Sequence, residues 1–335
     1  MSQTTTQPTT QVIAIGNAIV DVMAPCADAL IEQLGLVRGG MTLVDTERAH
    51  ELYQAMGPAR EISGGSAANT QAGLAALGSS CAFIGQVADD QLGEVFAHDI
   101  RAGGISFATA ARAGDPPTAR CLIFVTPDGQ RTMNTYLGAS QFLPPAALDE
   151  AAIAGAEILY LEGYLWDPAE PRAAMRRAIA AARGAGRKVA FTLSDAFVIE
   201  RHGDDFRAMI AAGEIDILFA NHIELAALTG LPDFHDGIAA LQGQVPLLVV
   251  TRGEDGAVAA SGGQLFEVPA QPVAKVIDTT GAGDLFAAGF LHGHVNGRTV
   301  TECLTLGAIC AAEVISHYGA RPEADLAALA QDMLN

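Results

Sequence analysis

Asp278-Thr279-Thr280-Gly281-Ala282-Gly283-Asp284 stands directly before an apolar stretch, Leu285 to His292, that reads as a buried helix. Gly281 and Gly283 permit close backbone approach and unusual dihedral angles. Free N–H groups at the start of a helix bind anions, so this loop predicts a site for a transferring phosphate. Asp284 falls in the first helical turn, where its carboxylate is placed to take a proton from an attacking hydroxyl. The simpler alternative is a capping aspartate after a flexible loop.

Two earlier motifs carry groups that suit a ligand with several hydroxyls. Gly64-Gly65 precedes a predicted helix, Ala67 to Leu77, and Asn69 lies one turn inside it. Backbone N–H groups and an amide at this place can hold vicinal hydroxyls. Asp21 follows Gly16-Asn17 and three apolar or small residues, where an isolated carboxylate can accept hydrogen bonds from a sugar diol. Taken alone, the first motif is also an ordinary glycine-started helix, and the second a solvated loop acid.

Two later motifs directly follow predicted strands. Asn221 and Glu224 come after the strand Ile215 to Phe219, where an amide and a carboxylate can organise water around Mg²⁺. The alternative is a helix cap followed by a surface glutamate. The segment 251–256 follows the strand Leu247 to Val250, and it either wraps a nucleotide or makes a hairpin turn.

Strands and helices alternate along most of the chain. Apolar strands are predicted at 12–15, 81–84, 157–161, 188–193, 215–219 and 246–251, and helices at 27–37, 46–57, 67–77, 92–101, 169–184, 203–212, 223–228, 236–242, 283–295, 301–317 and 323–333. Runs at 121–125 and 132–137 form a hairpin outside this alternation, and a second hairpin covers 256–268. The pattern predicts an α/β fold with a mostly parallel sheet and helices on both faces. Ligands of such sheets bind beyond the carboxyl ends of the strands.

The balance of charge disfavours several classes of partner. The 335 residues carry 19 basic and 38 acidic side chains, a formal net charge of −19, whereas nucleic acid requires a basic surface. The same charge disfavours a membrane surface, and no apolar run reaches the roughly 18 residues of a membrane helix. The five cysteines form no C-x-x-C pair, as expected of reduced thiols in a cytoplasmic protein. Residues 1–10 are polar and predict a disordered tail. No P-loop, H-E-x-x-H or G-x-S-x-G motif is present.

Taken in this order, the motifs resemble those of the ribokinase family of carbohydrate and nucleoside kinases, named also after a bacterial phosphofructokinase. The resemblance runs from about residue 11 to 330. It implies a ribokinase-like kinase domain over 11–335, with a small β-rich lid formed by about 17–62 and 105–140. Within the family the chain looks most like adenosine kinases, because of the Asn17 to Asp21 spacing, the two helices within 27–57, and the stretches 191–197 and 215–221.

The resemblance implies ATP-dependent transfer of the γ-phosphate to the 5′-hydroxyl of adenosine or a related purine nucleoside. Asp284 would be the base. The N–H groups of Gly281, Ala282 and Gly283 would form the anion hole. Arg131, on the first hairpin, would reach the phosphates, although a solvated turn arginine is the alternative.

The same resemblance assigns the binding residues. Substrate hydroxyls would be held by Asn17, Asp21, Gly64, Gly65 and Asn69, and ATP would lie against Asn221, Glu224, Thr251, Gly253 and Gly256. Glu224 would bind Mg²⁺ through water. Asp278 and Thr280, with the loop 316–319, resemble the monovalent-cation site, often for K⁺, that many members have.

The nucleobase end of the pocket departs from the adenosine-kinase pattern. Its matching positions are Met133, Thr135 and either Tyr164 or Leu165. A sugar or sugar acid of the ribose, fructose or 2-keto-3-deoxygluconate type is therefore the alternative acceptor. A catalytically silent binding protein on the same scaffold is a third hypothesis, which the presence of Asp284 opposes. The family contains monomers and homodimers, and the helices within 27–57 favour a monomer.

Overall fold

The computed structural model describes residues 10–334. The predicted tail, 1–10, lies outside the described residues except for Thr10. Among the described residues, no helix combines the length and the apolar character that crossing a membrane requires.

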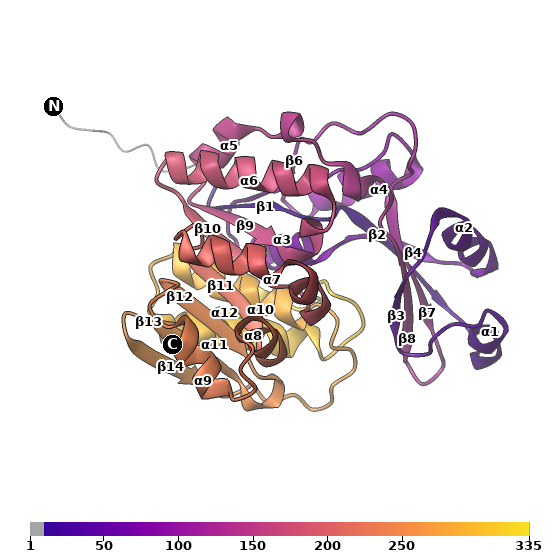
Figure 1. Ribbon diagram of the computed structural model, residues 1–335. Coiled ribbons are helices and arrows are strands. Elements are labelled where there is room, and N and C mark those ends of the chain that lie inside the picture. Colours follow the sequence, from indigo (N-terminus) through magenta and orange to yellow (C-terminus); the bar gives the residue numbers. More distant parts are fainter. Residues whose placement is uncertain (1–9, 335) are drawn as a thin grey trace.

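A nine-stranded sheet forms the centre of the molecule, in the order β14-β13-β12-β11-β10-β9-β1-β5-β6 (Figure 1). Its strands are β1 (Val12–Ile15), β5 (Cys81–Ile84), β6 (Ser106–Phe107), β9 (Ile158–Glu162), β10 (Lys188–Thr192), β11 (Ile217–Asn221), β12 (Leu247–Thr251), β13 (Ala257–Ser261) and β14 (Gln264–Val268). All neighbours from β12 to β6 are parallel, and β13 is antiparallel to both of its neighbours. The mostly parallel sheet and the hairpin within 256–268 are thus confirmed.

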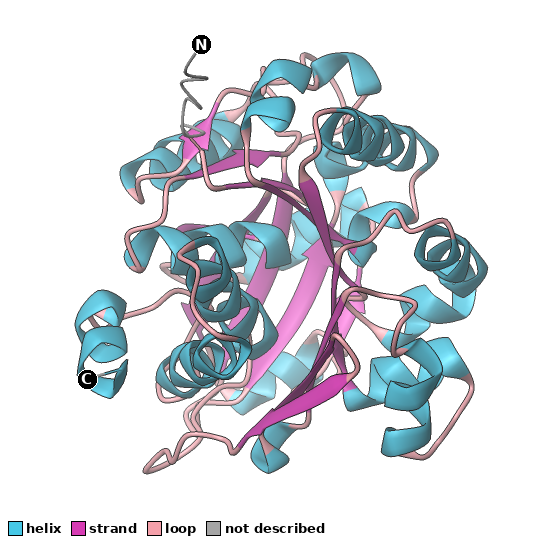
Figure 2. Cartoon of the chain, turned by 90° about the vertical axis from the view of Figure 1, so that its left-hand side faces the viewer, coloured by secondary structure: helices cyan, strands magenta, loops and turns pink. Residues whose placement is uncertain are grey.

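Helices cover both faces of this sheet (Figure 2). One face packs against α3 (Ser66–Ala76), α4 (Gln91–Ala102), α10 (Ala282–Val295) and α11 (Val300–Val314). The other packs against α5 (Glu150–Gly155), α6 (Ala169–Gly184), α7 (Ala196–Ala211), α8 (His222–Thr229) and α9 (Phe234–Leu241). Because side chains alternate along a strand, Val12 and Ala14 enter the first core layer, and Ile13 and Ile15 the second. The last helix, α12 (Leu326–Leu334), contacts α3 and α11.

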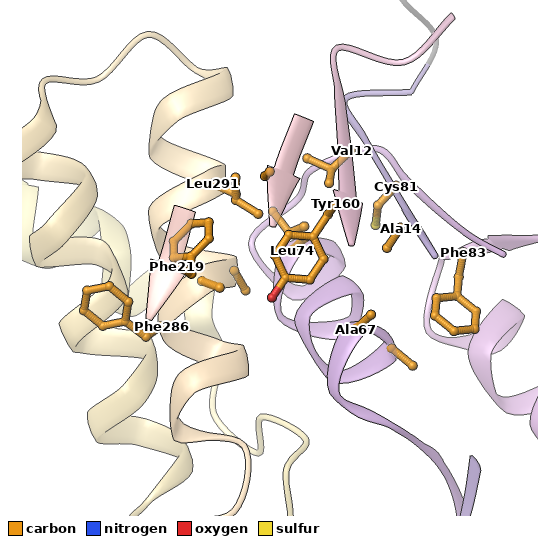
Figure 3. Packing of buried hydrophobic residues seen from close by; sticks show 14 of the residues in the cluster. Val12, Ala14, Ala67, Leu74, Cys81, Phe83, Tyr160, Phe219, Phe286 and Leu291 are labelled. Carbon is orange, nitrogen blue, oxygen red and sulfur yellow. The ribbon is translucent and has the colours of Figure 1, made fainter. Parts of the chain in front are cut away.

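Close packing positions α10 beside α3 and α11. A Cβ added at Gly73 would lie 2.6 Å from the Ala288 Cβ, and one at Gly289 would lie 2.4 Å from the Leu306 carbonyl oxygen. Figure 3 shows Tyr160 and Leu74 in the middle of this core layer, with Phe219 and Phe286 on one side and Phe83 on the other.

A second, five-stranded sheet stands beside the first, at the right of Figure 1. Its order is β3-β8-β7-β2-β4, with β2 (Ile19–Pro25), β3 (Met41–Leu43), β4 (Arg60–Gly64), β7 (Ala119–Val125) and β8 (Arg131–Tyr136). The predicted hairpin corresponds to β7 and β8. The helices α1 (Asp28–Gln33) and α2 (Thr46–Ala55) cover its outer face. Its role as a lid stays a prediction.

Alternation divides the side chains of this small sheet between two environments. Val20, Val22, Leu122 and Phe124 are buried in the hydrophobic core. The intervening positions of β2, β7 and β8 belong to the opposite face, which meets a cavity.

Three sequence-based boundaries need correction. The helix predicted at 203–212 begins at Ala196, because the Asp195 side chain caps it by accepting from the Phe197 N–H. The helix predicted at 27–37 ends at Gln33, before Gly35 with its positive φ of 62°. The segment 105–140 was assigned to the small β-rich part, but its first strand, Ser106–Phe107, pairs with β5 of the large sheet.

Candidate active site

Two neighbouring cavities lie at the carboxyl ends of the parallel strands. The sheet cavity, about 610 Å³, is lined by residues of both sheets. The helix cavity, about 560 Å³, lies against α10, α11 and the segment 270–276. They share Thr251, Gly253, Thr279, Ala282, Gly283 and Phe286. A group bound at the N-terminus of α10 is therefore accessible from both sides.

Most predicted site residues line the sheet cavity. They are Asn17, Asp21, Gly65, Asn69, Met133, Thr135, Tyr164, Asn221, Glu224, Thr251, Gly253, Thr280, Gly281, Ala282, Gly283 and Asp284. Gly256 lines the helix cavity together with Thr251 and Gly253. Gly64, Arg131 and Asp278 lie behind these walls, in contact with residues that line them or with one another.

The start of α10 offers free backbone donors. Gly281 is its N-cap residue in a left-handed conformation, with φ 78°, and a Cβ there would lie 2.6 Å from the Ala320 Cβ. The Ala282 N–H donates to the Thr279 carbonyl at 3.2 Å. The N–H groups of Gly281 and Gly283 donate to none of the described residues. These two donors, with the partial positive charge of the helix terminus, can bind an anion.

Asp284 lies in the first turn of α10, and α3 holds its carboxylate. Oδ1 accepts from the Ser66 hydroxyl at 2.6 Å, and Oδ2 accepts from the Asn69 amide at 3.0 Å. Desolvation raises the pKa of Asp284, and both hydrogen bonds oppose that rise. The carboxylate is thus fixed in direction and takes a proton more readily than an exposed aspartate. Ser66, which was given no role at the sequence level, thus helps to hold this carboxylate.

Asp21 and Asn69 keep acceptor atoms for a ligand. None of the described residues donates a hydrogen bond to the Asp21 carboxylate, and desolvation raises the pKa of Asp21 to about 6. The Asn69 Oδ1 atom is buried and has no partner among the described residues. Because a buried acceptor without a donor is costly, ligand hydroxyls at this place would relieve both.

Gly64 and Gly65 let the backbone pass between these groups. A Cβ at Gly64 would lie 2.6 Å from the Asp21 carboxylate. Gly65 has φ 100°, and a Cβ there would lie 2.2 Å from the Asn17 carbonyl oxygen. At position 64 a side chain would clash with the Asp21 carboxylate. At position 65 a side chain would clash with the Asn17 carbonyl oxygen and would also disfavour the positive φ, so both positions require glycine.

Glu162, which was missed at the sequence level, lines the floor of the sheet cavity at the end of β9. Its side chain is fully buried and accepts from the Asn17 N–H and amide, each at 2.7 Å, and from the Ala67 N–H at 2.8 Å. Desolvation raises the pKa of Glu162 to about 7. Ser140 donates to the Asn17 Oδ1 at 2.8 Å, so Asn17 is engaged at both ends. A glutamate directly after a buried strand was the available signal.

Arg131 and Asp278, predicted for separate roles, form an ion pair. The Asp278 carboxylate also accepts from the Thr280 N–H and hydroxyl, at 3.0 and 2.7 Å, and from the Gly319 N–H at 3.0 Å. Despite desolvation, these partners hold the pKa of Asp278 below its ordinary value. The side chains of Asp278 and Thr280 are thus already engaged and do not favour a directly bound cation. A K⁺ site here stays a prediction.

Asn221 and Glu224 form a capping box at the start of α8. Glu224 accepts from the Asn221 N–H at 3.0 Å and from its amide at 2.7 Å. Desolvation raises the pKa of Glu224 to about 7. A carboxylate has about four acceptor positions, so one facing the cavity can still hold a metal-bound water. The donor set fits Mg²⁺ bound through water.

Away from the polar corner around Asp284, the sheet cavity is largely apolar. Its apolar lining includes Met41, Leu43, Ile123, Met133, Leu137, Tyr164 and Phe197. Its charged lining is acidic, from Asp21, Glu162, Asp167, Glu224 and Asp284, and no Lys or Arg of residues 10–334 lines it.

Comparison with known proteins shows which class of reaction this site belongs to. Residues 39–326 match the model of the pfkB family carbohydrate kinases. The chain belongs to the pfkB carbohydrate kinase family. Such a kinase transfers phosphate, with ATP as the donor, to an alcohol group of a sugar or nucleoside.

Two solved structures are similar to the kinase over nearly its whole length. The adenosine kinase from Sinorhizobium meliloti is 47% identical, with a TM-score of 0.89, and the match covers 97% of this chain and 99% of that one. A probable sugar kinase from Rhizobium etli is 43% identical, with a TM-score of 0.90 and the same coverage. The ribokinase-like fold is thereby confirmed.

Among curated proteins, the ATP-dependent ribose-1-phosphate kinase of Halopiger xanaduensis is 32% identical to the kinase over 291 residues, 84% of this chain and 93% of its own length. The relatives therefore include enzymes named for nucleosides and for sugars, and the choice between these acceptors rests on the cavity.

Proposed function

We propose that the kinase transfers the γ-phosphate of ATP to the 5′-hydroxyl of adenosine or a related purine nucleoside, with Mg²⁺ as the metal. The lining of the sheet cavity supports this proposal, because it is polar around Asp284 and largely apolar elsewhere. Asp21 and Asn69 offer acceptors for a ribose diol beside Asp284, and Met133 and Tyr164 belong to an apolar remainder that suits a flat base. A volume of about 610 Å³ accommodates more than a monosaccharide.

The charge of the cavity supports a neutral acceptor. A sugar acid or sugar phosphate would place a further negative charge beside Asp21 and Asp284, and no Lys or Arg of the described residues lines the cavity to bind that charge directly. A neutral sugar of the ribose or fructose type is the second candidate, since its hydroxyls can use the same acceptors. A 2-keto-3-deoxygluconate-type acid is disfavoured.

The chemistry follows from the placement of the groups at α10. Asp284 takes the hydroxyl proton as the acceptor oxygen attacks the γ-phosphorus. The N–H groups of Gly281 and Gly283 face the charge that develops on the phosphoryl oxygens. Mg²⁺ supplies charge neutralisation on the phosphates, and Glu224 would hold it through water. Thr251, Gly253 and Gly256, on the helix cavity, are on the side from which ATP would enter.

A substrate panel tests the proposal. The purified kinase is assayed with Mg²⁺ and ATP against adenosine, inosine, guanosine, cytidine, ribose, fructose and 2-keto-3-deoxygluconate. Adenosine or another purine nucleoside should give the highest kcat/KM. Rapid phosphorylation of fructose or ribose, with no turnover of any nucleoside, would overturn the acceptor assignment while leaving the reaction class intact.

A pair of variants tests the apolar wall. Met133→Ala should raise the KM for a nucleoside several-fold with little effect on the KM for ATP, because truncation removes buried contact with the base. Leu265→Ala is the matched control, since Leu265 is 54% exposed on β14 and lines neither cavity. Equal KM values for Met133→Ala and wild type would place the base elsewhere.

A further inference from the structure

Three consecutive residues near the C-terminus connect the phosphate-binding loop to the rest of the site. The Gly319 N–H donates to Asp278 at 3.0 Å. Ala320 is buried against Gly281, where an added Cβ would lie 2.6 Å from the Ala320 Cβ. Arg321 follows directly. Gly319 and Ala320 therefore both contact the loop that precedes α10, and Arg321 is the next residue in the chain.

The Arg321 guanidinium binds both ends of the turn from Ser63 to Ala68, which contains Gly64 and Gly65. Its Nε and Nη2 donate to the Ser63 carbonyl at 3.0 and 2.5 Å, and Nη2 also donates to the Ser63 hydroxyl at 2.9 Å. Its Nη1 donates to the Ala68 carbonyl at 3.0 Å. Ser63 precedes Gly64 on β4, and Ala68 lies in the first turn of α3. One planar fork thus spans the turn from strand to helix.

Each end of this turn is one residue from a carboxylate of the site. Gly64, next to Ser63, packs against the Asp21 carboxylate. Asn69, next to Ala68, donates to the Asp284 carboxylate at 3.0 Å. A displacement of this turn would therefore move the partners of both Asp21 and Asp284.

The charge of Arg321 is not neutralised by its direct partners. Its acceptors are carbonyl and hydroxyl oxygens, and it forms no ion pair with a described residue. The carboxylates within its electrostatic reach are Asp99, Asp21 and Asp284. Asp99 is bound to Ser63, accepting from its N–H at 2.8 Å. The other two belong to the sheet cavity.

We propose that Arg321 is a positioning residue for phosphotransfer, whose guanidinium fixes the turn between Ser63 and Ala68 and whose charge offsets the negative charge gathered at Asp21 and Asp284. The inference rests on the proposed role of Asp284 as the base and is independent of which acceptor is used. If the only role of Arg321 were to hold the turn between Ser63 and Ala68, replacing it would not change the pKa of Asp284.

The other groups around Asp284 cannot supply this charge. Asp21 on β2, Glu162 and Tyr160 on β9, and Tyr164 all interact with Asp284 and are acidic or neutral. Arg131 acts on Asp21 more strongly than Arg321 does, but it is paired with Asp278 and is not among the groups that act on Asp284. Desolvation raises the pKa of Asp284, and among the described residues Arg321 is the cation that opposes the rise.

The test compares pH profiles of kcat/KM, from about pH 5 to 9, for Arg321→Gln, Arg321→Lys and wild type. The acceptor is whichever compound of the panel the kinase phosphorylates. Arg321→Gln should shift the acid limb upward by about half a pH unit or more and lower kcat/KM about tenfold or more. Arg321→Lys should keep the acid limb while lowering kcat, because lysine retains the charge but cannot hold both carbonyls.

Arg187→Gln is the matched control. Arg187 is also partly buried and donates to a backbone carbonyl, that of Ala154 at 2.8 Å, but it lines neither cavity. Its variant should show the wild-type profile. An unmoved acid limb in folded Arg321→Gln would overturn the proposed charge effect.

Thermal unfolding of each variant separates a folding defect from a catalytic one. If Arg321→Gln does not fold, Arg321→Lys decides, and a folded lysine variant with wild-type kcat would overturn the proposal. A kinase that uses a sugar in place of adenosine would refute the proposed acceptor while leaving this test in force.

Discussion

Arg131 and Asp278 form a buried ion pair that joins strand β8 of the small sheet to the loop before α10. Their side chains are 5% and 8% exposed. The sequence predicts that Arg131 reaches a phosphate. Its Nη1 contacts Asp278, while its buried Nε has no partner among the described residues, so a phosphate can share the guanidinium with Asp278 or replace it. Asp278 keeps Thr280 and Gly319 as partners in either case.

We expect Arg131→Ala to lower both stability and turnover. Removing one partner of a buried pair costs about 3–5 kcal/mol. The kcat should fall more than the acceptor KM changes, because the phosphate contact forms mainly in the transition state. Denaturant unfolding and steady-state kinetics measure the two effects.

Arg38→Ala is the control for this variant. Arg38 pairs with Asp28 and Asp128, but its side chain is 45% exposed, so its loss should change neither quantity by much. A higher acceptor KM with unchanged kcat in Arg131→Ala would assign Arg131 to ground-state binding.

Asp284→Asn should lower kcat by roughly 10²–10⁴-fold, the usual contribution of a general base. The asparagine amide can still contact Asn69 and Ser66, so the fold should persist, as thermal unfolding would verify. Ser66→Ala removes one hydrogen bond to the base and should cost only several-fold. Turnover of Asp284→Asn within a few-fold of wild type would remove Asp284 from its role.

Gly64→Ala should raise the KM for the acceptor with little effect on the KM for ATP. The new Cβ would lie 2.6 Å from the Asp21 carboxylate, so Asp21 must move away from its position at the cavity. Gly155→Ala is the control, because a Cβ there meets nothing within 4 Å and its φ is not positive. Unchanged acceptor kinetics in Gly64→Ala would show that Asp21 does not bind the acceptor.

The stability of the kinase should depend on pH through its buried carboxyl groups. Desolvation raises the pKa of Glu162 from 4.5 to about 7, so between these values the folded state binds more protons than the unfolded state. The contribution of Glu162 is therefore fully present below about pH 4.5 and is lost as pH rises through about 7. Asp21 and Glu224, with pKa values of about 6 and 7, act in the same direction.

Glu162→Gln isolates the contribution of Glu162 to the pH dependence of stability. The amide nitrogen cannot accept from the Ala67 N–H, so absolute stability should fall, but the loss of stability between about pH 4.5 and 7 should become shallower. Urea unfolding at several pH values measures that slope. A slope identical to wild type would show that Glu162 keeps the same proton occupancy folded and unfolded.

Motifs whose chemistry is local were predicted from the sequence. The glycine loop before α10 and the placement of Asp284 in its first turn lie within a few residues, so their geometry follows from the start of a helix. The parallel sheet was predicted for a similar reason, since each buried strand is a short apolar run. For Asn221 and Glu224 the helix cap was the alternative to a Mg²⁺ site, and it placed Glu224 on the surface, whereas Glu224 is buried within the capping box.

Two residues that reach the site across the fold, Glu162 and Arg321, were not predicted. Glu162 bonds to Asn17, 145 positions away, and Arg321 bonds to Ser63, 258 positions away. Nothing in their local sequence reports such partners. Asp21 was interpreted as part of a loop. It lies in the seven-residue strand β2, where Ile19 and Met23 are as apolar as the buried Val20 and Val22, so the sequence shows no polar–apolar alternation and only pairing with β4 and β7 reveals the strand.

The two sheets contribute to the site unequally. The phosphate end is built at α10 on the large sheet, whereas Ile123, Met133, Met41 and Leu43 come from strands of the small sheet. Substitutions at these four positions can therefore change which alcohol is recognised while Asp284 and the loop before α10 stay unchanged. This separation makes Ile123, Met133, Met41 and Leu43 the positions to vary in directed evolution towards new acceptors.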